Sequence, residues 1–293
     1  MFSESVRAAW NAAGGSASAC LQDSRDSMTL AKPYFIQISD MHLFADPQAQ
    51  MWGVAPDPTL DRTLDMLLRE APEPDFVLVT GDCSSDGSAE SYVRLQAKLQ
   101  RLAAPLHYLP GNHDDPALFA RLLMGSALPA DGKLKQVFET CGWRFVLLDS
   151  VVAGTDIGRI GPPQYRWLRE TLQARSSLPT VIAVHHNPLP VGSAWLDTMT
   201  IEDGAELLHI VDACAQVRLV LFGHVHQEFE SVRNHAGYLS APSTFFQFKP
   251  ASPVFAQDAE RGAGARVVGL RGGAAESKVL RINEPVSAKA YRR

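Results

Sequence analysis

The stretch "LFGHVHQEF" (residues 221–229) runs from an apolar segment directly into His224 and His226, which are separated by a single residue. The apolar part, "RLVLFG" at 218–223, is short and rich in branched side chains, as expected of a buried β-strand. Two histidines at a strand end are either a chance pairing in a loop or ligands of a metal ion. The second interpretation requires the other ligands to lie elsewhere in the chain.

Similar apolar segments precede this strand and alternate with helical patterns. The predicted strands cover residues 34–39, 76–80, 106–110, 145–149, 181–185 and 218–223. Apolar residues at helical spacing predict helices over 58–71, 88–102, 162–174 and 201–214. This alternation predicts an α/β layered fold with the sheet inside. After residue 223 four short strand candidates follow, "FESVRN", "GYLSAP", "RVVGLR" and "KVLRIN". They could form a second sheet, giving a sandwich flanked by helices in one domain.

Polar side chains follow five of these strands, at the carboxyl ends where ligands bind in such folds. They are Asp40, His42, Asp82, Asn112, His113, Asp114, His185, His186, His224 and His226. Any one of these pairs is common loop chemistry, because glycine and aspartate are ordinary turn residues. Five strand ends that all carry such residue types predict a metal site.

The residue types restrict the kind of metal site. Carboxylate and imidazole without thiolate suit Mn, Fe, Zn or similar ions better than a structural zinc held by cysteines. The set is too large for one tetrahedral centre, so we expect two ions ~3.5–4 Å apart with Asp82 as the bridging carboxylate. Water shared by two cations would have its pKa lowered toward neutrality and would supply hydroxide.

The motifs D-x-H, GD, GNHD, H and GHxH, in this order, resemble the signature of the calcineurin-like metallophosphoesterases over residues 34–285. The segments "HHNPLPVGSAWLD" (185–197), "GHVHQE" (223–228) and "APSTFFQFKP" (241–250) look like those of the bacterial class III cyclic-nucleotide phosphodiesterases of the CpdA type. This resemblance implies a metal-dependent hydrolase. It also implies a four-layer α-β-β-α sandwich, the metallo-dependent phosphatase fold, with its active site at the C-terminal ends of the strands.

The resemblance also implies a role for each matching residue. One metal ion would bind Asp40, His42, Asp82 and His226, and the other would bind Asp82, Asn112, His185 and His224. His113 would lie over the phosphate, where it stabilises the transition state or protonates the leaving oxygen, and Asp114 would orient its ring. Asn112 and His224 are expected to contact the substrate as well. Iron and manganese are the expected metals, although zinc, cobalt or magnesium would suit the same ligands.

The sequence leaves the roles of three residues near these motifs open. His186 follows a ligand position, so it is either a phosphate contact or a packing histidine behind the site. Trp195 could stack on a nucleobase or pack into the core or a subunit interface. The role of Asn187 stays open.

The expected reaction is hydrolysis of 3',5'-cyclic AMP to 5'-AMP by a metal-bridging hydroxide, with the 3'-oxygen as leaving group. The same centre could cleave another phosphodiester, such as a 2',3'-cyclic nucleotide, a glycerophosphodiester or a nucleotide-sugar pyrophosphate. A scaffold protein that has lost catalysis is disfavoured, because no ligand of the motif set is missing. A nuclease is disfavoured because the net charge is −5 and no basic cluster is present.

Composition and the chain ends lead to expectations about the compartment and the domain bounds. The four cysteines follow no metal or disulfide spacing, so we expect reduced thiols in a cytoplasmic protein. No apolar run approaches the ~18–20 residues that cross a bilayer. We expect a disordered leader over 1–32, or an extension upstream of a start at Met28, then a metallophosphoesterase domain over 33–285 and a tail over 286–293. A small phosphodiester is the expected partner, bound by a monomer or homodimer.

Overall fold

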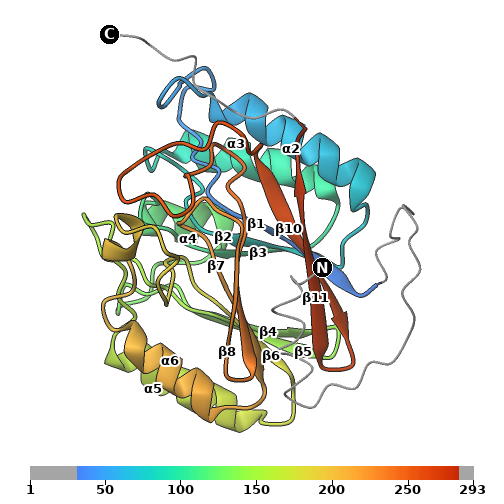
Figure 1. Ribbon diagram of the computed structural model, residues 1–293, viewed down its shortest axis with the longest axis vertical. Coiled ribbons are helices and arrows are strands. Elements are labelled where there is room, and N and C mark those ends of the chain that lie inside the picture. The colour runs from blue at the N-terminus through green and yellow to red at the C-terminus, as the bar shows by residue number, and fades with distance from the viewer. Residues whose placement is uncertain (1–31, 284–293) are drawn as a thin grey trace.

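The computed structural model describes residues 32–283, which form two β-sheets packed face to face (Figure 1). The first sheet has the strand order β11-β10-β1-β2-β3. Its strands are β1 (Tyr34–Ile38), β2 (Phe76–Thr80), β3 (Leu106–Leu109), β10 (Gly264–Arg271) and β11 (Ala274–Arg281). The strands β1, β2 and β3 are parallel, whereas β10 runs antiparallel to β1 and to β11.

The second sheet has the strand order β4-β5-β6-β7-β9-β8. Its strands are β4 (Gln136–Thr140), β5 (Trp143–Leu147), β6 (Thr180–Ala183), β7 (Val217–Phe222), β8 (Phe229–Arg233) and β9 (Ala236–Ser240). The four central strands are parallel, and the edge strands β4 and β8 are antiparallel to their neighbours. The carboxyl ends of the parallel strands of both sheets therefore lie on the same side of the molecule.

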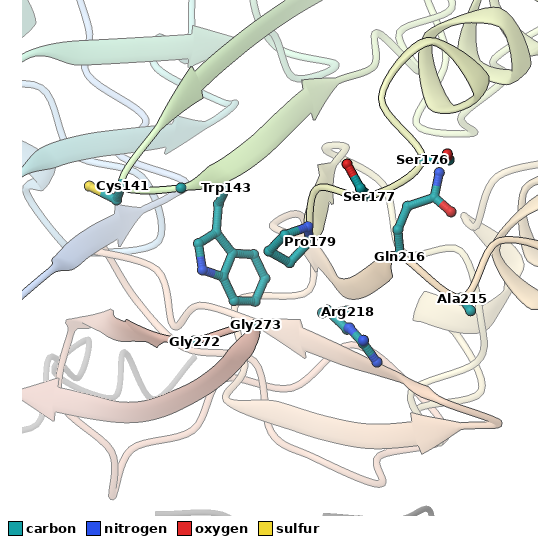
Figure 2. A pocket seen from close by; sticks show the side chains of 11 residues that line it. Cys141, Trp143, Ser176, Ser177, Pro179, Ala215, Gln216, Arg218, Gly272 and Gly273 are labelled. Atoms are coloured by element: carbon teal, nitrogen blue, oxygen red, sulfur yellow. The ribbon is translucent and has the colours of Figure 1, made fainter.

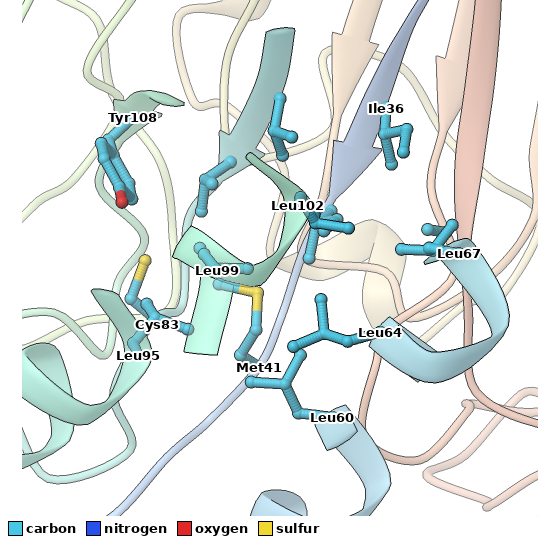
Figure 3. Packing of buried hydrophobic residues seen from close by; sticks show 14 of the residues in the cluster. Ile36, Met41, Leu60, Leu64, Leu67, Cys83, Leu95, Leu99, Leu102 and Tyr108 are labelled. Carbon is cyan, nitrogen blue, oxygen red and sulfur yellow. The ribbon is translucent and has the colours of Figure 1, made fainter. Parts of the chain in front are cut away.

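Helices cover the outer face of each sheet, as Figure 1 shows. The first sheet is covered by α2 (Pro56–Glu70), α3 (Ala89–Leu99) and α4 (Pro116–Leu123), and the second by α5 (Pro162–Ala174) and α6 (Gly204–Ala213). Two 3-10 turns, η1 (Gln100–Leu102) and η2 (Leu196–Thr198), lie in the connections. Leucines of α2 and α3 pack against β1 in the first outer layer (Figure 3). The apolar stripe predicted for residues 58–71 thus faces the sheet.

A third apolar layer fills the space between the two sheets. The ring of Phe35 stacks on Phe76 at 4.7 Å, and Phe145 of the opposite sheet lies edge-on to Phe76 at 4.9 Å. Side chains alternate along a strand, so Phe35 faces this layer while Ile36 faces the helices. Strands buried on both faces read as continuous apolar runs, which is why they were recognisable in the sequence. The predicted four-layer α-β-β-α sandwich is confirmed.

One expectation about the elements is wrong, and two elements were not predicted. The strands after residue 223 do not form a sheet of their own, since β8 and β9 extend the sheet of β7 while β10 and β11 pair beside β1. The sequence also failed to indicate β4 and α4. The strand β4 is a partly exposed edge strand, and α4 has only eight residues, so neither carries a strong periodic signal.

The predicted leader lies outside the described residues except for Lys32, and the predicted tail at 286–293 lies wholly outside them. Within residues 32–283, no helix combines the length and the apolar character that crossing a bilayer requires.

Candidate metal centre

The loops that follow β1, β2, β3, β6 and β7 meet at one edge of the sandwich, and backbone hydrogen bonds join them. The N–H of Asp40 donates to Gly81 O at 3.1 Å, and that of His42 donates to Asp82 O at 2.9 Å. Across the two sheets, the N–H of His224 donates to Asp40 Oδ1 at 3.0 Å. The strand ends of both sheets therefore form a single cluster.

Five residues of this cluster have left-handed backbone conformations. The φ angles are 57° at Asp40, 51° at His42, 50° at Asp82, 67° at His224 and 44° at His226. Such conformations are uncommon for residues with a side chain and cost on the order of 1 kcal/mol each. They turn the chain sharply after β1, β2 and β7, so that the polar side chains there point into the space between the loops.

The first group of side chains contains Asp40, His42 and His226, which are all buried. The Nε2 atoms of His42 and His226 lie 3.1 Å apart, and His226 Nε2 lies 3.6 Å from Asp40 Oδ1. One ligand atom from each of the three residues lies within 4.8 Å of the other two. Oxygen and nitrogen donors at this spacing can all reach a single cation.

The second group contains Asp82, His185 and His224 and lies beside the first. The side-chain oxygen of Asn112 completes it, at 3.1 Å from His185 Nε2 and 3.2 Å from His224 Nδ1. Asp82 Oδ2 lies 3.4 Å from His185 Nε2 and also 3.4 Å from His42 Nε2. One carboxylate oxygen is therefore shared between the two groups.

The protonation of three of the four imidazoles in the two groups suits metal ligands. Burial alone would lower the pKa of the fourth, His185, but Asp82 and Asp40 beside it raise that pKa to about 9. Burial lowers the pKa of His42 and of His224 to about 3, and it holds that of His226 well below its usual value. Neutral rings offer a lone pair, as metal binding requires. Burial alone would raise the pKa of Asp82, but His185 and His113 beside it hold that pKa well below the usual value. The carboxylate that the two groups share is therefore ionised.

An unpaired buried atom also fits a cation. Asp40 Oδ2 has no hydrogen-bond partner within the described part of the chain, although it is buried. Leaving a buried polar atom without a partner costs about 1–3 kcal/mol. Cations between the two groups would satisfy such atoms, and the donors are oxygen and nitrogen without sulfur. The clustered ligands thus indicate a dinuclear metal site.

Hydrogen bonds behind the imidazoles set which nitrogen faces the cluster. His185 Nδ1–H donates to Thr80 O at 2.8 Å, and His226 Nδ1–H donates to Phe246 O at 3.0 Å. The Nδ1 of His42 lies 3.3 Å from Ser85 Oγ. These three rings therefore direct Nε2 into the site, as metal-binding histidines commonly do, whereas His224 faces Asn112 Oδ1 with its Nδ1 at 3.2 Å. Sequence reasoning missed these partners, because a backbone carbonyl leaves no signature in the residue types.

Glycines of the GD and GNHD motifs allow the loops to approach closely. A side chain at Gly111 would overlap the Oδ1 and backbone N of Asp82, and one at Gly81 would overlap the His185 ring. Gly81 also has φ of 93°, a conformation that disfavours other residues. The motif glycines are thus required by contact distance as well as by turn geometry.

The GNHD loop places its three polar residues differently. Asn112 Nδ2 donates to Asp156 Oδ1 at 3.1 Å, a contact that the sequence did not suggest. His113 is exposed, with its ring 4.8 Å from that of His42, at the edge of the cluster. An opening of about 510 Å³ lies beside Asn112 and His113. A substrate group could enter there and reach both side chains.

Asp114 is buried and joins two loops. Its carboxylate accepts hydrogen bonds from the N–H of Ser84 at 3.0 Å, of Cys83 at 3.3 Å and of Gly111 at 2.9 Å. Tyr92 Oη also donates to it at 3.2 Å. These contacts give Asp114 a role in holding the loops, and orientation of the His113 ring by Asp114 stays a prediction.

His186 and Trp195 lie where packing dominates. His186 is fully buried, its Nδ1 lies 2.7 Å from Ser150 Oγ, and Gly158 covers its ring so closely that a side chain there would overlap it. This burial favours packing over a phosphate contact. Trp195 is half-buried, with its ring edge-on to Phe248 at 4.8 Å. Asn187 is buried, and its Nδ2 donates to Leu189 O.

A second cavity lies at the opposite ends of the strands. It has a volume of about 590 Å³ and is lined by Trp143, Pro179, Gln216 and Arg218 among others (Figure 2). Its lining includes no histidine and no carboxylate. The chemistry predicted from the strand ends therefore belongs to the other edge of the sandwich.

The four-layer fold and the paired ligand groups define a metal-dependent hydrolase with a dinuclear site. The family model for calcineurin-like phosphoesterases matches residues 33–228. The chain therefore belongs to the calcineurin-like phosphoesterase family, as the resemblance of its motifs predicted.

Curated relatives and solved structures agree with this assignment. The chain is 36% identical over 235 residues to the 3',5'-cyclic adenosine monophosphate phosphodiesterase CpdA of Pseudomonas aeruginosa, covering 80% of this chain and 85% of the relative. It is 37% identical over 224 residues to a 3',5'-cyclic-nucleotide phosphodiesterase of a Nostoc species, covering 76% and 83%. A dimetal phosphatase from Danio rerio has the same fold, with a TM-score of 0.62 at 16% identity, covering 85% of this chain and 98% of that one.

Proposed function

We propose that this protein hydrolyses 3',5'-cyclic AMP to 5'-AMP. The observation that carries the proposal is the pair of buried ligand groups that share Asp82 Oδ2, at 3.4 Å from His42 Nε2 and from His185 Nε2. Relatives that are 34–37% identical and bear the names of cyclic-nucleotide phosphodiesterases support the choice of substrate. A small phosphodiester, in preference to nucleic acid, also agrees with the net charge of −5.

The proposed ligand sets follow the two groups. One ion is assigned to Asp40, His42, Asp82 and His226, and the other to Asp82, Asn112, His185 and His224. Iron and manganese are the proposed metals. When bound, two such ions would lower the pKa of water and withdraw charge from phosphoryl oxygens. The rest of the chemistry belongs to side chains of the chain itself.

His113 is proposed to protonate the departing 3'-oxygen. An alkoxide is a poor leaving group, so a proton donor beside it lowers the barrier and typically raises the rate about 10²–10⁴-fold. His113 is exposed at the edge of the cluster and borders the 510 Å³ opening, which leaves its ring free to meet the substrate. Asn112 and His224 are proposed to contact the non-bridging oxygens.

The test is release of 5'-AMP from 3',5'-cyclic AMP by protein stripped of metal and reloaded with Mn²⁺. Asn112→Ala is the control, because it removes a proposed ligand. Activity on 3',5'-cyclic AMP that exceeds activity on 2',3'-cyclic AMP and is lost in Asn112→Ala would support the proposal. Weak cleavage of cyclic AMP beside fast cleavage of a generic phosphodiester would replace the substrate while keeping the metal centre.

Two expectations from the sequence stay predictions. The first is a monomer or homodimer as the state in solution. The second is a cytoplasmic location. Light scattering of the purified protein and fractionation of cells that express it would check them.

A further inference from the structure

An exposed aromatic surface lies beside the first ligand group. Trp52 is 51% exposed and Phe255 is 44% exposed, and the centroids of their rings lie 4.7 Å apart. Val254, next to Phe255, is 64% exposed. These three residues are called the aromatic patch below. Large apolar side chains gathered in this way on a surface commonly mark a binding site.

Ring contacts connect the aromatic patch to the metal centre. The centroid of Phe246 lies 5.0 Å from that of Trp52 and 5.0 Å from that of His226, so Trp52 and His226 are at most twice that distance apart. On the other side, Phe248 stacks on His226 at 4.4 Å and contacts Phe255 at 5.6 Å. The aromatic patch is therefore separated from His226 by one layer of buried rings, Phe246 and Phe248.

The backbone holds both exposed rings in place. Trp52 is at the tip of a turn in which Met51 and Val54 exchange two backbone hydrogen bonds, of 3.0 and 3.1 Å, and its φ is 50°. The N–H of Lys249 donates to Ala256 O at 2.8 Å, which fixes the loop that carries Phe255. Rings that are ordered before binding lose little conformational freedom on contact with a ligand.

We propose that Trp52 and Phe255 form the subsite for the nucleobase of the substrate. The inference rests on the proposed function, since it assumes that the phosphate of a nucleotide binds at the metal centre. The planes of the two rings are inclined by 55°, so one can stack on a planar base while the other meets its edge. Trp195, the residue that the sequence suggested for stacking, has its ring covered by Phe248 and Phe255 instead.

The chemistry of stacking defines the class of ligand. Base-aromatic stacking tolerates different bases, because each has a flat π-face. The aromatic patch has no charged residue, so it would bind a planar base and not a phosphate. The metal centre would bind the phosphate. A phosphodiester without a nucleobase would gain nothing from this surface.

The experiment is calorimetric binding of two probes to the Mn²⁺-loaded protein. The probes are 5'-AMP and ribose 5-phosphate, which share the sugar and phosphate and differ by the base. The wild type is expected to bind 5'-AMP more tightly. In Trp52→Ala and in Phe255→Ala, the Kd of 5'-AMP should rise about tenfold while that of ribose 5-phosphate stays within about twofold.

Matched variants separate stacking from general damage. Trp52→Phe keeps a ring and should retain most of the affinity for 5'-AMP. Leu68→Ala removes exposed apolar surface outside the patch, on α2, where the side chain is 39% exposed. This variant should bind 5'-AMP as the wild type does.

Three results would overturn the inference. The first is equal binding of the two probes by the wild type. The second is equal weakening of both probes in the alanine variants, which would mean that the patch acts through the metal centre. The third is a change of oligomeric state in Trp52→Ala with 5'-AMP affinity unchanged, which would make the patch a contact between copies of the chain. If the wild type fails to hydrolyse 3',5'-cyclic AMP, the proposed function is refuted. The comparison of 5'-AMP with ribose 5-phosphate would still test the subsite.

Discussion

The amide of Asn112 is held between Asp156 and two histidines. Its Nδ2 donates to Asp156 Oδ1 at 3.1 Å, while its Oδ1 faces His185 Nε2 at 3.1 Å and His224 Nδ1 at 3.2 Å. An amide can rotate by half a turn, which would point its NH₂ group into the cluster. Asp156 favours the orientation in which the oxygen is available to a cation.

We therefore expect Asp156→Ala to weaken metal binding at the second group about 10-fold to 100-fold, the usual effect of losing a partner behind a metal ligand. Calorimetric titration of the metal-free protein with Mn²⁺ would measure it. Asp156→Asn can still accept the hydrogen bond and should lose less. Asp65→Ala, on the exposed face of α2, is the matched control. Equal affinity in Asp156→Ala and the wild type would show that Asp156 does not orient Asn112.

Asp82→Asn should reduce the metal content to below one ion per chain. Asp82 Oδ2 lies 3.4 Å from one histidine of each group, so its charge serves both ions. An amide keeps the shape but removes the negative charge between two cations. Elemental analysis after dialysis would check the content, and circular dichroism would establish that the variant is folded. Two tightly bound ions in this variant would contradict the shared role of Asp82.

Removal of metal should lower the thermal stability. At a free metal concentration 100 times the Kd, a bound ion stabilises the folded state by about 2.7 kcal/mol. For a domain of this size that corresponds to a fall in Tm of roughly 5–10 °C on chelation. Thermal scans with and without a chelator measure the difference. Asp82→Asn should show a much smaller response, and an equal response would mean that the stabilising metal binds elsewhere.

His113→Ala should lower kcat for 3',5'-cyclic AMP by about 10²–10⁴-fold with the metal content unchanged, because a proton donor is lost and a ligand is not. The loss should be much smaller for methyl p-nitrophenyl phosphate, whose leaving group needs no proton. Steady-state kinetics with both substrates provide the comparison. His113 also lies within reach of His42 and Asp82, so a fall in metal content would identify it as a ligand instead.

Gly111→Ala should destabilise the protein by about 1–3 kcal/mol and impair metal binding. The added methyl group would overlap the carboxylate and backbone of Asp82, so the two loops would have to separate. Urea unfolding would measure the loss. Gly269→Ala is the matched control, since its nearest neighbour, Glu276 O, would lie 3.9 Å away. Equal stability in both variants would show that the loops can move apart without cost.

The fold was largely predictable because strands buried on both faces appear as apolar runs. Such runs identified β1, β2, β3, β5, β6 and β7, and the helices between them followed from their apolar stripes. The strands β8, β9, β10 and β11 were recognised as candidates but assigned to the wrong sheet. Pairing between distant strands depends on which edges are open once the sandwich has formed, and a local pattern holds no information about that.

The sequence by itself determined the candidate donors, since Asp40, Asp82 and His224 each follow a strand whose type and end are visible in the residues. Only the tertiary structure decided which candidate donors lie together, which ring nitrogen of His185 faces them, and that Asp156 contacts Asn112. The physical reason is range: a strand end is set by neighbouring residues, whereas a coordination site is set by distances between loops that lie on two separate sheets.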